Sequence, residues 1–315
     1  MTLVTSDTQL AAQHLIQGGL VALPTETVYG LGANAESETA VAKIYKAKNR
    51  PNDHPVIVHI SNPALVSHWA KEVPTFATKL MNAFWPGPMT LILERTPAAK
   101  DFITGNQETV GLRVPNHPVA LDVLARFEAL GGKGIAAPSA NRYGAVSPTT
   151  SKAVADSLGE YLSPGDLVLE GGNSEIGLES TIIDCTSQSP RILRPGAITK
   201  EMIEGLLGQQ VESPTEVDIR VSGSHKQHYS PDAKVVLNVI PVAGEGLIAL
   251  ASVPTPAGVV RLAAPETLEE FARELYSALR KADELGLEKL SIFEPEGSGL
   301  GIAIRDRVTR AAAKS

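Results

Sequence analysis

Residues 46–60, KAKNRPNDHPVIVHI, place cations directly before a proline and then run into an apolar strand. The preceding segment predicts a helix over residues 38–48, in which Val41, Ile44, Tyr45 and Lys48 fall at positions i, i+3, i+4 and i+7 of one face. Lys48 falls on that apolar stripe, and Pro51 favours extended backbone at Arg50, so the helix is expected to end there. Two explanations stay open for Lys48 and Arg50: they complement the negative end of the helix dipole, or they bind an anion.

The rest of the first two thirds of the chain repeats this order of helix and strand. Short apolar runs alternate with helix-period segments from residue 8 to about 205, which is typical of an α/β protein. The expected helices lie at residues 8–17, 38–48, 75–84, 117–128 and 150–158. The expected strands are GLVALPT (19–25), PVIVHI (55–60), MTLILER (89–95), VGLRVP (110–115), GIAAPSA (134–140), DLVLEGG (166–172) and STIIDCT (180–186).

The last third of the chain predicts a smaller unit behind a connector. Residues 206–232 are polar and without periodicity, which is typical of a linker. Strands are expected near 233–240, 246–251, 257–262 and 289–295, with helices over 266–286 and 302–314. We therefore expect a large domain over residues 1–205, a linker over 206–232 and a small α/β domain over 233–315, a plausible size for an independent unit.

Composition limits the class of protein. The net charge is −7 and the pI is near 5.6, whereas a protein that binds nucleic acid non-specifically is usually basic. Residues 233–315 hold 10 Lys/Arg against 11 Asp/Glu, which leaves 18 against 24 elsewhere, so neither part is basic. The single cysteine, Cys185, rules out an internal disulfide, and the start MTLVTSDTQLAAQ lacks the pattern of a signal peptide. A cytoplasmic protein with no membrane span is expected.

Polar side chains sit at the ends of several apolar strands. Alternation places His59 and Arg113 on the opposite faces from their apolar neighbours, and Ser139 and Asn141 follow a strand of small residues, while Ser180 precedes one. Each has a plain structural explanation: a hydrogen-bonded core histidine, a solvent-facing edge arginine, a helix cap or turn, a strand terminus. Together they favour one cleft, since α/β folds bind ligands at strand ends.

The kind of ligand follows from the chemistry of these groups. Two or three cations with many neutral donors suit a polyanion that carries a small polar partner, such as a nucleotide and an amino acid. Neither GxxxxGK[ST] nor GxGxxG occurs at a strand-to-helix turn, and Ser139 lies in PSAN rather than in GxSxG. There is also no Cys/His cluster with the spacing of metal ligands, so no metal site is expected in the protein itself.

A series of motifs occurs in a fixed order along residues 8–205. They are ALPTETVYGLG, the KxR of Lys48 to Arg50, RPNDHPVIVHI, ETVGLRVP, PSAN with SPT at residues 147–149, ESTIID and ILRPGAI. In this order they resemble the YrdC-type threonylcarbamoyl-AMP synthases. The HYSP of the linker and the trailing α/β unit resemble the long, two-domain form of that family. The resemblance implies a YrdC-like twisted mixed sheet with flanking helices, plus a smaller, Rossmann-like C-terminal domain.

The same resemblance implies the reaction and its partners. L-threonine, bicarbonate or CO2, and ATP would give threonylcarbamoyl-adenylate and pyrophosphate. A separate tRNA threonylcarbamoyl transferase would then modify the adenosine next to the anticodon. Mg2+ is expected on the triphosphate, without a dedicated protein site, because magnesium often binds mainly through phosphates and water.

Residue roles are likewise implied by the resemblance, by matching motif positions. The catalytic tetrad would be Lys48, Arg50, Ser139 and Asn141. L-threonine would be surrounded by Thr27, His59, Arg113, Ala137 and Ser180. ATP would contact Arg50, His54, Thr109, Ser139, Ser147, Arg194 and Tyr229. We further expect the linker segment with His228 and Tyr229 to fold over the cleft and exclude water from the mixed anhydride.

The linker and the strand after Pro55 depart from the family's pattern. Gln227 stands where an arginine is frequent, which puts the linker's contacts in doubt, and Val56 replaces a usual leucine, a tolerable core exchange. Two other functions are alternatives to this one. An RNA-binding or ribosome-maturation module conflicts with the charge, although a weak RNA contact remains compatible with it. A carbamoyl transferase, as in hydrogenase-maturation proteins, would need zinc-finger neighbours that this one-cysteine chain does not carry.

Overall fold

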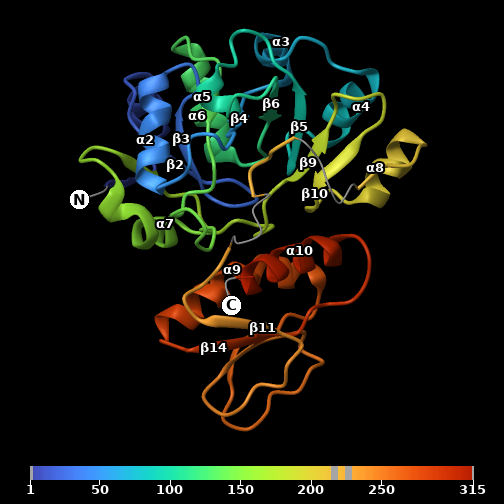
Figure 1. Cartoon of the computed structure of the whole chain (residues 1–315). Helices are drawn as coiled ribbons and strands as arrows, with labels where there is room; N and C mark the ends of the chain where they lie inside the picture. Colours follow the sequence, from blue (N-terminus) through green and yellow to red (C-terminus); the bar gives the residue numbers. More distant parts are fainter. Residues whose placement is uncertain (1–2, 214–218, 224–228, 314–315) are drawn as a thin grey trace.

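The computed structural model describes residues 3–213, 219–223 and 229–313. It contains two sheets, a large twisted mixed one in the first part of the chain and a small parallel one in the last part (Figure 1). The expected fold class, a mixed α/β sheet with flanking helices followed by a smaller α/β unit, is confirmed. The division of the chain at residues 205 and 232 stays a prediction.

The large sheet has ten strands in the order β1-β8-β2-β3-β7-β4-β6-β5-β9-β10. Their bounds are β1 (Leu3–Thr5), β2 (Val21–Leu23), β3 (Gly30–Asn34), β4 (Ile57–His59), β5 (Met89–Glu94), β6 (Thr109–Arg113), β7 (Ile135–Ala136), β8 (Leu167–Leu169), β9 (Thr181–Asp184) and β10 (Arg191–Arg194). Strands β4 and β6 are parallel, and their register sets His59 opposite Arg113. Strands β1, β3 and β10 were not predicted. The sequence of β3, GLGAN, lacks the β-branched residues that signal a strand.

Five helices lie where the sequence predicts them, within one residue at each end. These are α1 (Thr8–Ile16), α2 (Glu38–Lys48), α4 (Thr75–Phe84), α6 (Pro118–Ala129) and α7 (Ser151–Leu158). The short helices α3 (Val66–Trp69) and α5 (Asp101–Thr104), helix α8 (Lys200–Leu207) and 3-10 turns at Pro63–Leu65 and Gly159–Tyr161 were not predicted. Helix α2 begins at a Ser37 cap and ends at Asn49, whose left-handed backbone (φ 52°) turns the chain before Arg50.

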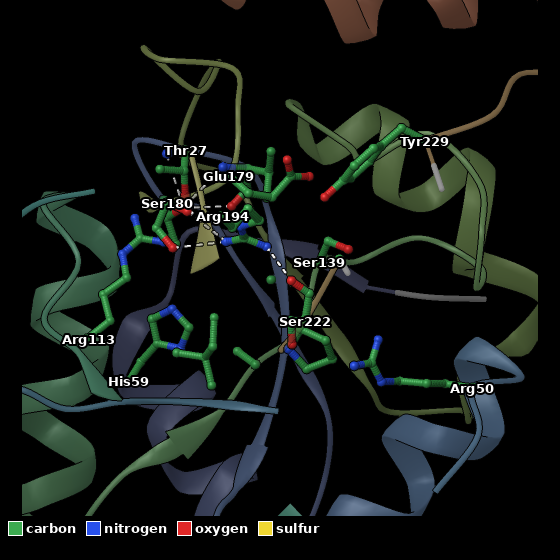
Figure 2. A pocket seen from close by; sticks show the side chains of 17 residues that line it. Thr27, Arg50, His59, Arg113, Ser139, Glu179, Ser180, Arg194, Ser222 and Tyr229 are labelled. Atoms are coloured by element: carbon green, nitrogen blue, oxygen red, sulfur yellow. Dashed lines mark hydrogen bonds between the residues drawn. The ribbon is translucent and has the colours of Figure 1, made fainter. Parts of the chain in front are cut away.

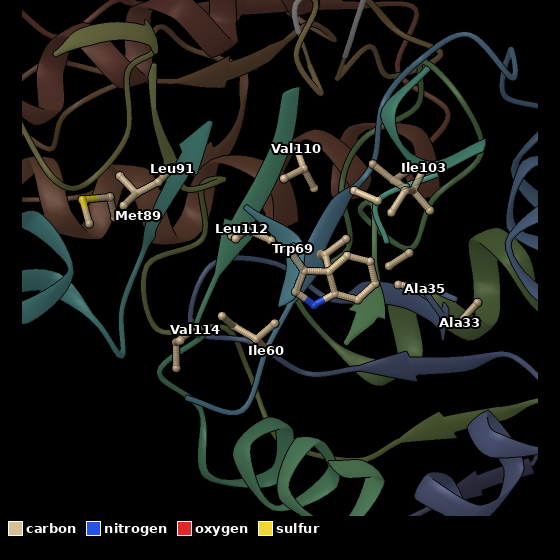
Figure 3. Close-up of a cluster of buried hydrophobic side chains, with 14 of the residues drawn as sticks. Ala33, Ala35, Ile60, Trp69, Met89, Leu91, Ile103, Val110, Leu112 and Val114 are labelled. Atoms are coloured by element: carbon tan, nitrogen blue, oxygen red, sulfur yellow. The ribbon is translucent and has the colours of Figure 1, made fainter. Parts of the chain in front are cut away.

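The core of the large sheet explains which side chains are left for the other face. Val110, Leu112 and Val114 of the β6 segment pack with Ile60 around the indole of Trp69 (Figure 3). The alternation predicted for both strands is thereby confirmed. His59 and Arg113, which occupy the intervening positions, therefore point away from this cluster.

The second sheet is entirely parallel, in the order β11-β14-β12-β13. Its elements are β11 (Lys234–Leu237), β12 (Gly246–Ile248), β13 (Val260–Ala263), α9 (Leu268–Glu284), β14 (Lys289–Ile292) and α10 (Leu300–Ala312). Helices α9 and α10 lie between this sheet and the first part of the chain (Figure 1). Val28, Val146 and Leu178 of the first part belong to the same buried apolar cluster as these helices. Within the described ranges, none of the helices combines the length and the hydropathy needed to cross a membrane.

Candidate active site

A polar pocket lies where several strand ends of the large sheet meet the linker (Figure 2). The structure brings a majority of the predicted site residues to its wall. These are Thr27, Arg50, His59, Arg113, Ala137, Ser139, Ser180, Arg194 and Tyr229. The other predicted residues, Lys48, His54, Thr109, Asn141 and Ser147, lie behind or beside the wall rather than in it. The expectation of one cleft at the strand ends therefore agrees with the geometry.

One side of the pocket is formed by the ends of β4 and β6. Arg113 is buried, so the solvent-facing explanation for this arginine is wrong. Its Nη2 forms an ion pair with Glu26 Oε1 at 2.7 Å, and its Nε donates to the carbonyl of Gly87. His59 lies next to Arg113 in Figure 2. Burial lowers the pKa of His59 to about 3, and the Arg113 charge lowers it too, so the imidazole is neutral at pH 7.

The buried neutral His59 predicts that stability falls with acid. In the unfolded chain this histidine protonates near its ordinary pKa of 6.5, whereas in the folded chain it stays neutral down to about pH 3. Between these values the unfolded state binds more protons, so His59 removes about 1.4 kcal/mol of stability for each unit that the pH falls. Urea unfolding of wild type and His59→Gln at pH 7, 6 and 5 should show the steeper loss in wild type. Parallel losses in the two proteins would contradict a buried neutral histidine.

Arg50 forms the opposite side of the pocket from Arg113 (Figure 2). Its Nη2 donates to the carbonyl of Pro55 at 2.9 Å, and its Nε has no hydrogen-bond partner within the part of the chain that the structure describes. Burial lowers the pKa of Arg50, as expected when a cation is kept out of water. A buried guanidinium with a donor to spare is suited to an anionic ligand.

Lys48 lies behind the wall and is almost completely buried. Its Nζ donates to the carbonyls of Ser139, at 2.7 Å, and of Asn141, at 2.5 Å. Burial, followed by the charges of Arg50 and Arg142, lowers the pKa of Lys48 well below its usual value. The apolar-stripe position of Lys48 is confirmed, and its side chain holds the PSAN loop through these two carbonyls. The dipole explanation requires a lysine exposed at the helix end, and Lys48 is not exposed.

Asn141 is also buried and helps to fix the same loop. Its Nδ2 donates to the carbonyls of Arg142 and Ala145, while its Oδ1 has no hydrogen-bond partner in the described ranges. The loop in turn presents Ser139 to the pocket, next to β3 through a bridge with Gly30. The Lys48 and Asn141 contacts thus position Ser139 as part of the wall.

The third arginine of the pocket reaches it from the end of β10. Arg194 donates from Nε and Nη2 to the carbonyl of Ser180, and from Nη2 to Ser180 Oγ at 3.1 Å. The Ser180 hydroxyl also shares a hydrogen bond of 2.8 Å with Thr90. On the other side, Arg194 Nη1 donates to the carbonyl of Ser222 in the linker. Arg194 therefore ties a pocket strand to the linker.

The described part of the linker contributes Ser222, Gly223 and Tyr229 to the pocket wall. The Arg220 guanidinium contacts Asp53 Oδ2 and the Gly105 carbonyl, and Ser222 Oγ donates to the carbonyl of Pro55. Tyr229 is buried and lies over the pocket (Figure 2). His228 and Gln227 lie outside the described residues, and closure of the linker over the cleft stays a prediction.

Three predicted ATP contacts lie around the pocket rather than in its wall. His54 lies 3.3 Å from the Tyr143 hydroxyl through Nδ1, and Thr109 begins β6 beside Val221 and Ser222. Ser147 donates to Glu179 Oε1 at 2.6 Å, so its hydroxyl is already engaged.

Sequence reasoning missed four residues that belong to this arrangement: Thr25, Glu26, Glu179 and Ser222. Glu26 and Glu179 stand inside quoted motifs, PTETVYG and ESTIID, but no role was given to them. A carboxylate set between small polar and apolar residues was the available signal, because such a carboxylate is seldom buried without a cation. Ser222 carried no signal, since it lies in a connector without periodicity.

Comparison with known families decides the relationship. The Sua5_yciO_yrdC model, described as "Telomere recombination", matches residues 13–196, and the model described as "Threonylcarbamoyl-AMP synthase, C-terminal domain" matches residues 198–313. The chain belongs to the Sua5/YciO/YrdC family. The predicted resemblance to the long form of this family is thereby confirmed.

Individual members of the Sua5/YciO/YrdC family align with this chain over nearly its whole length. The "Threonylcarbamoyl-AMP synthase" of Pyrococcus abyssi (strain GE5 / Orsay) is 37% identical, over 96% of this chain and 93% of the relative. A protein with the same name from Bacillus subtilis (strain 168) is also 37% identical, over 98% of this chain and 94% of its own. The crystal structure of P. abyssi Sua5 complexed with L-threonine has a TM-score of 0.88 and 35% identity, and the match covers 99% of this chain and 97% of that one.

Proposed function

We propose that this chain is a threonylcarbamoyl-AMP synthase, which condenses L-threonine, bicarbonate or CO2, and ATP to threonylcarbamoyl-adenylate and pyrophosphate. The observation that supports this best is one buried pocket with Arg50 on one side, Arg113 on the other and Arg194 between strand and linker. Three guanidiniums around one pocket suit a ligand pair with a triphosphate and a carboxylate. Relatives that match nearly the full length carry this name, and the similar crystal structure of P. abyssi Sua5 is a complex with L-threonine.

Threonine would bind at the Arg113 end. Arg113 would hold its carboxylate, and the neutral His59 and the hydroxyls of Thr27 and Ser180 would meet its polar groups. Ala137 would pack against its apolar part. His59 suits a neutral role, since its lowered pKa keeps it from adding charge beside Arg113.

ATP would bind at the Arg50 end, below the linker. Arg50 and Ser139 would face the phosphates, with Arg194 and Tyr229 on the linker side and His54, Thr109 and Ser147 farther out. Lys48 would act mainly by holding the backbone of Ser139 and Asn141.

The chemistry then needs positioning and charge rather than a covalent intermediate. The threonine amine attacks CO2 and loses a proton, which gives a carbamate. A carbamate oxygen attacks the α-phosphorus of ATP, and the bond to the β-phosphate oxygen breaks, so that pyrophosphate leaves and the mixed anhydride remains. Arg50 would stabilise the charge that develops on the phosphates, and the two ends of the pocket would keep the reacting anions in line.

Magnesium would arrive with the triphosphate. Glu179 is the carboxylate that lines the pocket, and its oxygens already accept hydrogen bonds from Ser147, Tyr276 and Arg307. The described residues hold no group of three or more His, Cys, Asp or Glu side chains that could bind a metal ion. This donor set fits an ion bound through phosphate and water better than an ion held by the protein.

The product implies a downstream partner. A threonylcarbamoyl-adenylate is an activated acyl donor, and we propose that a separate tRNA threonylcarbamoyl transferase consumes it in the cytoplasm, where tRNA and ATP are available. Any direct RNA contact of this acidic chain would be weak.

One assay tests the proposed function. Pyrophosphate release from ATP should require both threonine and bicarbonate, and omission of either should abolish it. The adenylate should appear in the mass spectrum together with the pyrophosphate. Release that is independent of threonine or of bicarbonate would contradict the proposal.

A further inference from the structure

Helices α9 and α10 of the second part reach the back of the pocket wall. Tyr276 of α9 stacks on Tyr229, with ring centroids 5.5 Å apart and planes inclined by 26°. Arg307 of α10 lies with its guanidinium 5.5 Å from the centroid of the same Tyr229 ring. The ring that covers the pocket is therefore held by two side chains from the C-terminal part of the chain.

Arg307 is completely buried, although it belongs to a helix that covers a small domain. Its Nε donates to Glu179 Oε2 at 2.9 Å, and its Nη2 donates to the Pro195 carbonyl at 3.0 Å. Its Nη1 donates to Asp306, which is held by Arg310 one turn later. Most of this buried guanidinium thus faces the first part of the chain.

Glu179 collects hydrogen bonds from three separate segments. Ser147 donates to Oε1, while Tyr276 and Arg307 both donate to Oε2. Burial alone would raise the pKa of Glu179, but the charges of Arg307 and then Arg194, with these hydrogen bonds, lower it to about 2. The carboxylate is therefore ionised at neutral pH and tied to the second part.

Arg307 engages the Glu179 carboxylate and the Pro195 carbonyl, and each of these residues adjoins a pocket residue. Glu179 precedes Ser180, and Pro195 follows Arg194; Ser180 and Arg194 both line the pocket and bond to each other. A shift of Arg307 would therefore move Ser180 and Arg194 together. The mechanism described above gives no role to Arg307, to Tyr276 or to the C-terminal part.

We propose that Arg307 and Tyr276 are positioning residues of the active site, which act through Glu179 and Tyr229 to fix the pocket edge at Ser180 and Arg194. The C-terminal part then acts as a brace, which here means a support that holds the pocket residues in place through Arg307 and Tyr276, and not as an independent module. The inference extends the proposed function, because threonine and ATP are the ligands whose binding should suffer.

The experiment compares three single variants of the full-length chain. Arg307→Met removes the cation and keeps an apolar stem of similar length. Tyr276→Phe removes one hydroxyl and keeps the ring that stacks on Tyr229. The control, Arg305→Met, removes an arginine of the same helix that donates at 2.7 Å to the carbonyls of Pro295 and Gly297, within the C-terminal part.

The kinetic readout is the KM for threonine and for ATP, measured well below the melting temperature of the least stable variant. We expect Arg307→Met to raise both KM values by about tenfold and Tyr276→Phe by about threefold, with Arg305→Met close to wild type. A purely structural role would lower the melting temperature and the active fraction in Arg307→Met but leave both KM values unchanged. That result would overturn the proposal.

The second readout does not depend on the activity. Amide hydrogen exchange of the segment around residues 178–181 should accelerate in Arg307→Met and, to a smaller extent, in Tyr276→Phe, but not in Arg305→Met. Unchanged exchange there in both variants would contradict the brace. If the wild type released no pyrophosphate, the proposed function would fail, and the exchange result would still decide the positioning role.

Discussion

Replacing Arg50 with alanine is expected to lower kcat by about 10²- to 10³-fold, the loss typical for removing one preorganised charge or donor from a transition state. Arg50 faces the pocket from the turn after α2, and in the part of the chain that the structure describes its side chain makes one hydrogen bond to the protein, to the Pro55 carbonyl. Its removal should therefore cost little folding energy. The measurement is steady-state pyrophosphate release together with the melting temperature.

Arg142→Ala is the matched control for Arg50→Ala. Arg142 donates to the Ala47 carbonyl of α2 and stacks on Tyr161, 4.1 Å from the ring centroid, but it does not line the pocket. Its loss should leave kcat within about twofold of wild type. If Arg50→Ala and Arg142→Ala lowered kcat equally, the role of Arg50 would be structural and the anion-binding assignment wrong.

Replacing Arg113 with alanine should damage both threonine binding and stability. The variant removes the proposed partner of the threonine carboxylate, and it also leaves Glu26 buried beside the empty site of its cation. An orphaned buried charge costs about 3–5 kcal/mol of unfolding free energy. Urea unfolding measures that loss, and calorimetric titration of threonine measures the binding.

The double variant Arg113→Ala/Glu26→Gln separates the two effects. Neutralising Glu26 removes the orphaned charge, so we expect about half or more of the lost stability to return. Threonine binding should stay lost, because the carboxylate partner is still absent. Restored threonine binding in the double variant would show that Arg113 serves only to neutralise Glu26.

The sequence could predict several residues of the pocket, because the buried positions of a helix or strand follow from the periodicity of its apolar residues. Lys48 lies on the apolar stripe of α2, and His59 and Arg113 interrupt alternating strands, so each was visible as a polar group in a buried position. The register that sets His59 opposite Arg113 was not visible, because it depends on which strands pair and not on either strand alone.

The buried position of Arg307, which supports the pocket, was not predicted, although it carries the same signal of a cation on an apolar stripe. In α10, Ile304, Arg307, Val308 and Ala311 repeat the i, i+3, i+4, i+7 spacing, and Arg307 is the cation on that stripe. What no pattern could supply was its target. Glu179 lies 128 residues earlier in the chain, and only the packing of the two parts brings them together. Ser222 was missed for a similar reason, since it lies in a linker without periodicity, whereas the HYSP motif made Tyr229 visible.

The apolar cluster that Val28, Val146 and Leu178 share with α9 and α10 has a consequence for anyone who would shorten this protein. A chain cut after the large sheet would uncover those three side chains to water and would also take Tyr229 from the roof of the cleft. The shortened fragment would expose an apolar surface, and its pocket would be open to water on the side that Tyr229 covers. Fusing an unrelated C-terminal domain would meet the same obstacle, because the surface between the two parts is apolar on both sides and its side chains form one cluster.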